Sequence, residues 1–249
     1  MSRRYKIELI EIIKDLGYLF YLIMLGIACI IMGIIRVILF FINMAIFYRS
    51  GYKKKTGKGY FKTVFDKGSY GEYLLYRKII KVIDKENVVL NMYLPSESQR
   101  VEDTELDIVA ISNKNIYCFE MKNYTGKIYG FRDQYRWSEY IRRKEYTFYN
   151  PLRQNEGHVK ALEKHLFVEK DNIVPVVVFS NKADITKVSA AGVLRLKEVK
   201  AYLMECEERN RDRYGEAQID KYIQKLNEAA DVSSDTIRNH IADVRELKR

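Results

Sequence analysis

The chain has few of the residues that build disulfide-rich or zinc-binding domains. Its 249 residues include three cysteines and three histidines. Cys29, Cys118 and Cys206 stand far apart, with no CxxC pattern and no cluster of cysteine and histidine. The sequence therefore argues against a disulfide framework or a structural zinc site, and it fits a reducing compartment. Cys118 lies in an apolar run and is expected to be a small core residue.

Internal repeats, low-complexity tracts and a general excess of basic residues are also absent. The formal net charge is +10, but six of these charges lie in one stretch without an acid: Arg49, Lys53, Lys54, Lys55, Lys58 and Lys62. The remaining charge, 10 − 6 = +4, is spread over the rest of the chain and is no evidence for nucleic-acid binding. The length fits one substantial domain with additions.

The N-terminal part carries a long hydrophobic segment. No charged residue occurs from Gly17 to Ile35, which is the length of a membrane-spanning helix. Apolar residues resume after Arg36 but end at Phe47, too soon for a second span. Because no small-residue cleavage site precedes its end and a basic segment follows, an anchor is favoured over a cleaved signal peptide.

Charges on either side of this segment predict its orientation. The N-terminal side carries Arg3, Arg4, Lys6 and Lys14, and the C-terminal side carries the six cations named above. This bias predicts a single-pass protein of the cell membrane with its C-terminal part in the cytoplasm. We assign residues 1–15 to an N-terminal segment, 16–48 to the membrane anchor and 49–64 to a basic juxtamembrane linker, expected to contact anionic lipid.

Two apolar runs in the middle of the chain predict a β-hairpin. Residues 106–111 and 116–122 are rich in β-branched and aromatic residues, and residues 112–115 read as a turn. A turn centred on Asn113 and Lys114 pairs residues whose numbers sum to 227, so Asp107 faces Glu120. Like charges in this position need a compensator, and a divalent cation is the obvious one. Lys122 falls on the same face, an arrangement typical of a metal-dependent phosphodiester hydrolase.

The other face of the hairpin is apolar as well, so both faces need cover. This predicts an α/β fold in which a mixed β-sheet is flanked by helices. Further strands are expected at 88–93, 126–130, 136–140, 145–148 and 173–180, and helices at 68–82, 150–167, 197–209, 216–230 and 236–247.

Four short motifs occur in one order along this pattern. They are Gly68-x-x-Gly71-Glu72, Thr104-Glu105-Leu106-Asp107, Glu120-x-Lys122 and Asn150-Pro151-x-x-Gln154. Together they resemble the nuclease-related domain (NERD), a branch of the PD-(D/E)XK nuclease superfamily. The resemblance covers residues 65–180 and extends to the helix ending at 209. It implies a restriction-endonuclease-like core over 65–209, followed by a C-terminal helical segment over 210–249.

The resemblance also implies a role for each matching residue. Asp107 and Glu120 would be the ligands of Mg²⁺ or Mn²⁺, and Lys122 the catalytic lysine. Glu72 would be a further acid near the metal, and Gln154 a helical residue of the active site. The implied activity is hydrolysis of phosphodiester bonds, with DNA as the nucleic-acid partner.

The sequence departs from the family pattern at two positions. Relatives often carry tyrosine four residues after the glutamine, where this chain has His158. The superfamily's leading proline is absent, because Leu106 precedes Asp107. The role of His158 is left open.

Each motif residue has a structural alternative. Glu72 is favourable near a helix start through the helix dipole. Lys122 would face Glu105 in the assumed register and form an ordinary ion pair. Gln154 and His158 share one helix face, as two surface residues would.

Two other classes of function remain open. One is a catalytically inactive NERD-like module that binds nucleic acid or a protein partner at the membrane. The other is a structural, membrane-associated interaction protein that uses its C-terminal helices.

Overall fold

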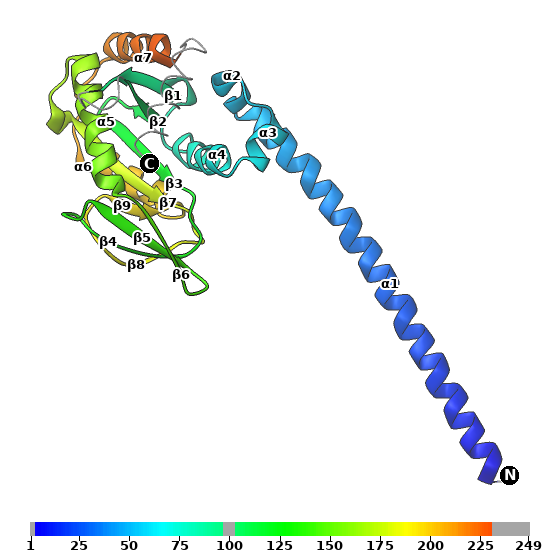
Figure 1. Ribbon diagram of the computed structural model, residues 1–249. Helices are drawn as coiled ribbons and strands as arrows, with labels where there is room; N and C mark the ends of the chain where they lie inside the picture. The colour runs from blue at the N-terminus through cyan, green and yellow to red at the C-terminus, as the bar shows by residue number, and fades with distance from the viewer. Residues whose placement is uncertain (1–2, 97–102, 231–249) are drawn as a thin grey trace. The chain divides into compact units, whose positions relative to one another are not determined.

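The computed structural model describes residues 3–96 and 103–230, and the chain divides into two compact units, Met1–Ser50 and Gly51–Arg249. Figure 1 labels the elements, beginning with α1 (Arg3–Arg49). The second unit contains helices α2 (Tyr52–Thr56), α3 (Tyr60–Phe65), α4 (Lys67–Ile79), α5 (Pro151–Leu166), α6 (Val199–Arg209) and α7 (Glu216–Ala230), with 3-10 turns at Lys85–Asn87 and Lys170–Asn172. Its strands are β1 (Val88–Pro95), β2 (Asp103–Ile111), β3 (Ile116–Lys122), β4 (Lys127–Phe131), β5 (Arg136–Ile141), β6 (Lys144–Tyr149), β7 (Ile173–Phe179), β8 (Asp184–Ser189) and β9 (Val193–Arg195).

Helix α1 is a single continuous helix of 47 residues (Figure 1). Its segment Lys14–Arg49 is the one described helix that is long and apolar enough to cross a membrane. An 18-residue window of this segment has a mean hydropathy of 2.8, and none of that window is buried. A helix with apolar side chains all round and no protein cover is suited to lipid surroundings.

The first sheet has the strand order β1-β2-β3-β7-β9 and is mixed. Strands β1, β2 and β3 are antiparallel, whereas β7 runs parallel to both β3 and β9. The predicted hairpin register is confirmed: Ile108 pairs with Phe119, and Ile111 with Ile116, so that each pair sums to 227. The ladder between β2 and β3 ends at the Ile108–Phe119 pair, one residue short of Asp107 and Glu120.

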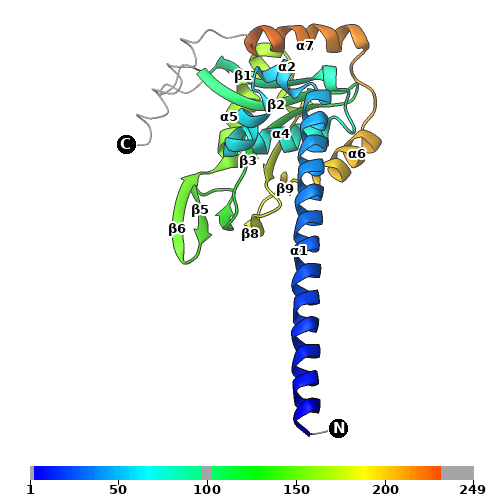
Figure 2. The same cartoon turned by 90° about the vertical axis from the view of Figure 1, so that its right-hand side faces the viewer.

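Helices cover both faces of this sheet, as the apolar character of its strands requires. Helices α5 and α7 pack on one face and enclose a core that includes Val109, Cys118 and Leu162. Helix α4 contacts β2 and β3 and also packs against α6. Figures 1 and 2 both show α7 running beside β1 at the edge of the sheet. The expected core position of Cys118 is confirmed, with no exposed surface.

A second sheet corrects the expectation of one sheet. Its strand order is β6-β5-β4-β8, with β8 parallel to β4. Trp137, Phe179 and Ile128 form the core between the two sheets. The fold is therefore mixed α/β with two mixed sheets. Strands β8 and β9 were not predicted, because both are short and largely polar or half-exposed and lack an apolar run.

The ends of the helices follow local capping chemistry. The Asp66 side chain accepts a hydrogen bond from the Ser69 N–H (2.7 Å) and starts α4. Asn150 accepts from the Leu152 N–H (2.9 Å), with Pro151 at the first helical position of α5. The predicted helices at 68–82, 150–167, 197–209 and 216–230 are confirmed apart from small shifts of their ends. The helix expected at 236–247 lies outside the described residues.

Candidate functional site

The candidate site lies where β2 leaves its partner β3. The backbone pairing of β2 with β3 ends at the Ile108–Phe119 pair. Beyond it, the Asp107 carboxylate accepts a hydrogen bond from the Met121 N–H (2.7 Å). This contact puts the Asp107 carboxylate against the backbone that joins Glu120 to Lys122. As a whole residue, Asp107 is half-buried.

Glu120 and Lys122 form a close ion pair beside Asp107. The Glu120 Oε1 lies 2.5 Å from the Lys122 Nζ, and the two side chains are 2% and 17% exposed. Lys122 also donates to the Gln154 Oε1 on α5 (2.9 Å). Lys122 is thus paired with Glu120 rather than with Glu105, the partner that the ladder register had offered.

Helix α5 is fixed against β3 so that its side chains reach Glu120. The Asn155 amide donates to the Cys118 carbonyl (3.0 Å), and the Cys118 thiol donates to the Asn155 Oδ1 (3.2 Å). Three residues further along the helix, the His158 Nδ1 lies 3.3 Å from the Glu120 Oε2. His158 and Gln154 therefore face the site together, and the interpretation of both as surface residues is wrong.

Glu72 reaches the same region from α4. Its Oε2 accepts hydrogen bonds from the Asn91 amide (3.3 Å) and the Tyr52 hydroxyl (3.4 Å). Asn91 lies between the pairs Leu90–Ile108 and Met92–Leu106, and so opposite Asp107. Glu72 thus approaches Asp107 through Asn91 on the adjacent strand.

A glycine allows α4 to come this close. A Cβ atom at Gly71 would lie 2.9 Å from the Asn123 Cβ and 3.2 Å from the Met121 Cε. Met121 lies in β3, and Asn123 is the first residue after it. Such distances are too short for a packed core. The absence of a side chain at Gly71 therefore brings the next residue, Glu72, to the site.

The electrostatics of the site reflect three crowded carboxylates. Burial, and then the charges of Glu120 and Glu72, raise the pKa of Asp107 well above its usual range. Burial also raises the pKa of Glu72, and Glu105 adds to the increase. For Lys122, burial lowers the pKa, but the charges of Glu120 and Asp107 outweigh it and raise the pKa. The ion pair with Lys122 compensates part of the carboxylate charge.

Sequence comparison identifies the domain that carries this geometry. Residues 67–180 match the family described as the nuclease-related domain. The chain contains a nuclease-related domain. All five predicted site residues, Glu72, Asp107, Glu120, Lys122 and Gln154, fall inside the matched range of this NERD domain.

Two further similarities add little about function. An uncharacterized protein of Bacillus anthracis is 32% identical over 123 residues, which cover 49% of this chain and 57% of that protein. The chain thus spans little more than half the length of this relative. A crystal structure of a protein of unknown function aligns with 70% of this chain and 97% of that one, at 12% identity and a TM-score of 0.29. A likeness this weak supports no statement about the fold.

Three residues at the site were not singled out from the sequence, or were left without a role. Asn91 and Tyr52 bind Glu72, and His158 contacts Glu120. Asn91 has a left-handed backbone (φ 53°) inside a strand, which asparagine tolerates better than most residues. An asparagine in the apolar run of β1 was the available signal. Tyr52 offered none, because it belongs to the basic linker far upstream in the sequence.

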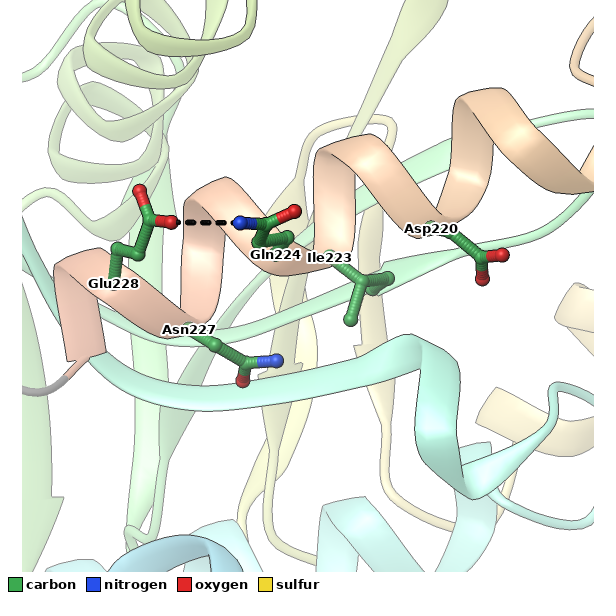
Figure 3. A pocket seen from close by; sticks show the side chains of 5 residues that line it. All are labelled: Asp220, Ile223, Gln224, Asn227 and Glu228. Atoms are coloured by element: carbon green, nitrogen blue, oxygen red, sulfur yellow. Dashed lines mark hydrogen bonds between the residues drawn. The ribbon is translucent and has the colours of Figure 1, made fainter.

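A surface hollow elsewhere on the NERD-containing unit is unrelated to this site. It lies along α7 and is lined by Asp220, Ile223, Gln224, Asn227 and Glu228, with Gln224 donating to Glu228 (3.1 Å) (Figure 3). None of the predicted site residues lines it. The candidate site therefore lies at the end of β3, away from this hollow.

Proposed function

We propose that the chain is a membrane-anchored, metal-dependent nuclease that hydrolyses phosphodiester bonds in DNA. The observation that carries the proposal is the gathering of Asp107, Glu120, Lys122 and Gln154 at the end of β3, inside a nuclease-related domain. On this proposal the sheet β1-β2-β3-β7-β9 with α4 and α5 is a restriction-endonuclease-like core of the PD-(D/E)XK type. The DNA substrate, the metal and the anchor are parts of the proposal.

The residues fit a hard divalent cation. Asp107 and Glu120 offer oxygen ligands; the buried Glu120 Oε2 accepts no hydrogen bond from the described residues, and the His158 Nδ1 lies 3.3 Å from it. Mg²⁺ keeps several water molecules and needs only one or two carboxylates, and Mn²⁺ accepts oxygen ligands too. Within residues 14–96 and 103–230, no three acidic, histidine or cysteine side chains are placed as a complete metal cluster. Water would therefore complete the ligand set.

The chain's own residues divide the work of hydrolysis. A bound cation would lower the pKa of a water molecule and neutralise charge on the phosphate. Lys122 would position the attacking water, because Gln154 and Glu120 hold its ammonium from two sides. Glu72 would add negative charge beside Asp107. Asn155, bound to Cys118, keeps α5 and thus Gln154 in register with β3.

A cleavage assay tests this proposal. The full chain in detergent micelles is expected to degrade DNA when Mg²⁺ or Mn²⁺ is added and to stop when EDTA is added. The Asp107→Ala variant is expected to lose this activity, whereas Asp103→Ala, an acid near the start of the same strand, should retain it. Equal degradation by Asp107→Ala and the unaltered chain would contradict the proposed site.

The ion pair also favours a second candidate function, a catalytically inactive NERD-like module that binds nucleic acid or a protein. Lys122 already occupies the Glu120 Oε1, as a structural pair would. Such a module would bind DNA in a salt-dependent manner and cleave none with any divalent ion. The same assay, read for binding as well as cleavage, separates the two functions.

The anchor and its orientation complete the proposal. Helix α1 would span the cell membrane once, with the NERD domain in the cytoplasm, because the cations that follow it outnumber those before it. The linker cations, Lys53, Lys54, Lys55, Lys58 and Lys62, would contact anionic lipid. Protease digestion of intact cells expressing the chain is expected to spare the NERD domain, and digestion after lysis to cut it.

A further inference from the structure

The sheet β6-β5-β4-β8 has one face that is buried at β4 and β5 and one face that is open. Alternation along the strands places Ile128 and Trp137 on the buried face, where they are 0% and 1% exposed. Residues paired across strands share a face, so the register defines the opposite side, here called the outer face. The outer face carries Tyr129, Phe131, Tyr140, Tyr149, Lys127 and Arg136.

Four aromatic rings lie open on this outer face. Tyr129, Phe131, Tyr140 and Tyr149 are 40%, 58%, 38% and 39% exposed. Tyr129 and Tyr140 meet edge to face with ring centroids 5.1 Å apart, which holds both rings in place. A monomeric soluble domain rarely exposes so many rings on one side of a sheet without a partner for them.

Basic side chains are interleaved with the rings. Lys127 and Lys187 lie on the strands β4 and β8, and Arg136 lies on β5. The turn between β5 and β6 adds Arg142 and Arg143, both in left-handed conformations that turn the hairpin tightly. Two acids on the outer face, Glu145 and Asp184, accept hydrogen bonds from the hydroxyl groups of Ser138 and Thr186. The face thus suits an anionic partner that also presents flat apolar surfaces.

The sheet is attached firmly to the candidate catalytic site. The Trp137 ring stacks on Phe179, 6.3 Å between centroids, and Phe179 pairs with Lys122 across β7 and β3. The Asn150 amide donates to two carbonyl groups of the turn between β4 and β5 (2.9 and 2.7 Å) and caps the helix that carries Gln154. Lys122 and Gln154, two residues of the candidate site, are therefore both connected to this sheet.

We infer that the outer face is a stacking platform for single-stranded nucleic acid, with Tyr129, Phe131 and Tyr140 stacking on unpaired bases and Lys127, Arg136 and Lys187 contacting the phosphates. Aromatic rings with interleaved cations are the means by which proteins hold single strands without reading their sequence. In a duplex the faces of the bases are already stacked on each other, so the rings would gain little. The inference rests on the proposed function and narrows its substrate to single-stranded nucleic acid.

A binding measurement without metal tests the platform separately from cleavage. The full chain in detergent micelles and EDTA is titrated into fluorescein-labelled oligothymidylate or oligouridylate of about 16 nucleotides, the upper end of common site sizes. A labelled duplex of equal length serves as the comparison, and fluorescence anisotropy is the readout. The ring variants are Tyr129→Ala and Phe131→Ala. The matched control is Tyr146→Ala, which is 51% exposed on the same sheet but pairs with Glu139 on the opposite face.

The expected result is tighter binding of the single strand than of the duplex. Each ring variant should weaken single-strand binding at least about fivefold, whereas Tyr129→Phe and Tyr146→Ala should bind as the unaltered chain does. Ring variants that bind the single strand normally would overturn the platform. So would a loss of equal size with Tyr146→Ala, or equal affinity for both probes.

The outcomes also separate this inference from the proposed function. A chain that binds single strands through its rings but cleaves nothing with added metal refutes the nuclease and retains the platform. A chain that cleaves, but whose ring variants bind and cleave normally, retains the nuclease and refutes the platform. A chain that binds neither probe refutes the platform.

Discussion

Replacing Lys122 by methionine removes the ammonium that lies 2.5 Å from the Glu120 Oε1 and keeps much of the length of the side chain. The Glu120 side chain is 2% exposed, so its charge is poorly solvated once the lysine is removed. Removing one partner of a buried ion pair destabilises a fold by about 3–5 kcal/mol. Because the Lys122 side chain is 17% exposed, some solvent screening remains. We therefore expect a loss near the lower limit, about 3 kcal/mol.

A second substitution tests whether the loss comes from the stranded charge. The double variant Lys122→Met with Glu120→Gln removes both charges and is expected to recover at least about 2 kcal/mol of the loss. Lys127→Met, on the next strand and exposed, is the control and should change the stability by no more than about 0.5 kcal/mol.

The assay is urea denaturation of the full chain in detergent micelles. The chain has one tryptophan, and Trp137 is 1% exposed between the two sheets, so its fluorescence reports unfolding of the NERD-containing unit. Added Mg²⁺ should stabilise Lys122→Met more than the unaltered chain, because Asp107 and Glu120 then have no competing ammonium. A loss below about 1 kcal/mol, with no recovery in the double variant, would refute the view that this pair is buried and coupled.

Three further predictions concern stability. Gly71→Ala should lose stability and cleavage activity, because a strain of about 1–3 kcal/mol against Asn123 exceeds the gain in helix propensity. The control Gly157→Ala, where an added Cβ would meet no atom within 4 Å, should gain up to about 1 kcal/mol of stability. Urea denaturation measures the stability of both variants. The pKa of Asp107 is raised in the native state, so the native state keeps the Asp107 proton to a higher pH than the unfolded state does. The free energy of unfolding should therefore fall as pH rises from the unfolded-state pKa of about 3.9 toward the raised native pKa. Asp107→Asn should lessen this fall when urea denaturation is repeated across pH. Glu207→Ala removes the acceptor of three hydrogen bonds at the β2–β3 turn and should cost about 2 kcal/mol in the same assay, without changing DNA cleavage at low temperature.

The sequence was most informative where local rules and burial agree. The hairpin register followed from a short polar turn between two apolar runs, since a slip by one residue would turn every side chain to the wrong face. The helix start at Asn150 was predicted from the sequence, and the Asn150 side chain caps this helix. These features depend on neighbours in the chain, and the first sheet followed from them.

Contacts between distant segments were predicted less well. The pairing of β8 with β4 joins segments far apart in the sequence, and neither strand has an uninterrupted apolar run. The partner of Lys122 was ambiguous because ladder register offered Glu105, whereas the strands part at Asp107 and leave Glu120 nearer. Tyr52 reaches Glu72 through the path of α2, which no local pattern encodes.

The charge balance at the end of β3 links stability to the proposed chemistry. Asp107 and Glu120 are brought together by the hairpin; burial and the charge of Glu120 raise the pKa of Asp107, and Lys122 pairs with Glu120. Carboxylates bind a metal in their deprotonated form, so a divalent cation on both groups would compete with protons for Asp107 and with Lys122 for Glu120. The affinity for such a cation should therefore rise with pH, and Gln154 would keep the released ammonium within the site. The ion pair that lowers the metal affinity also places the lysine for its proposed role.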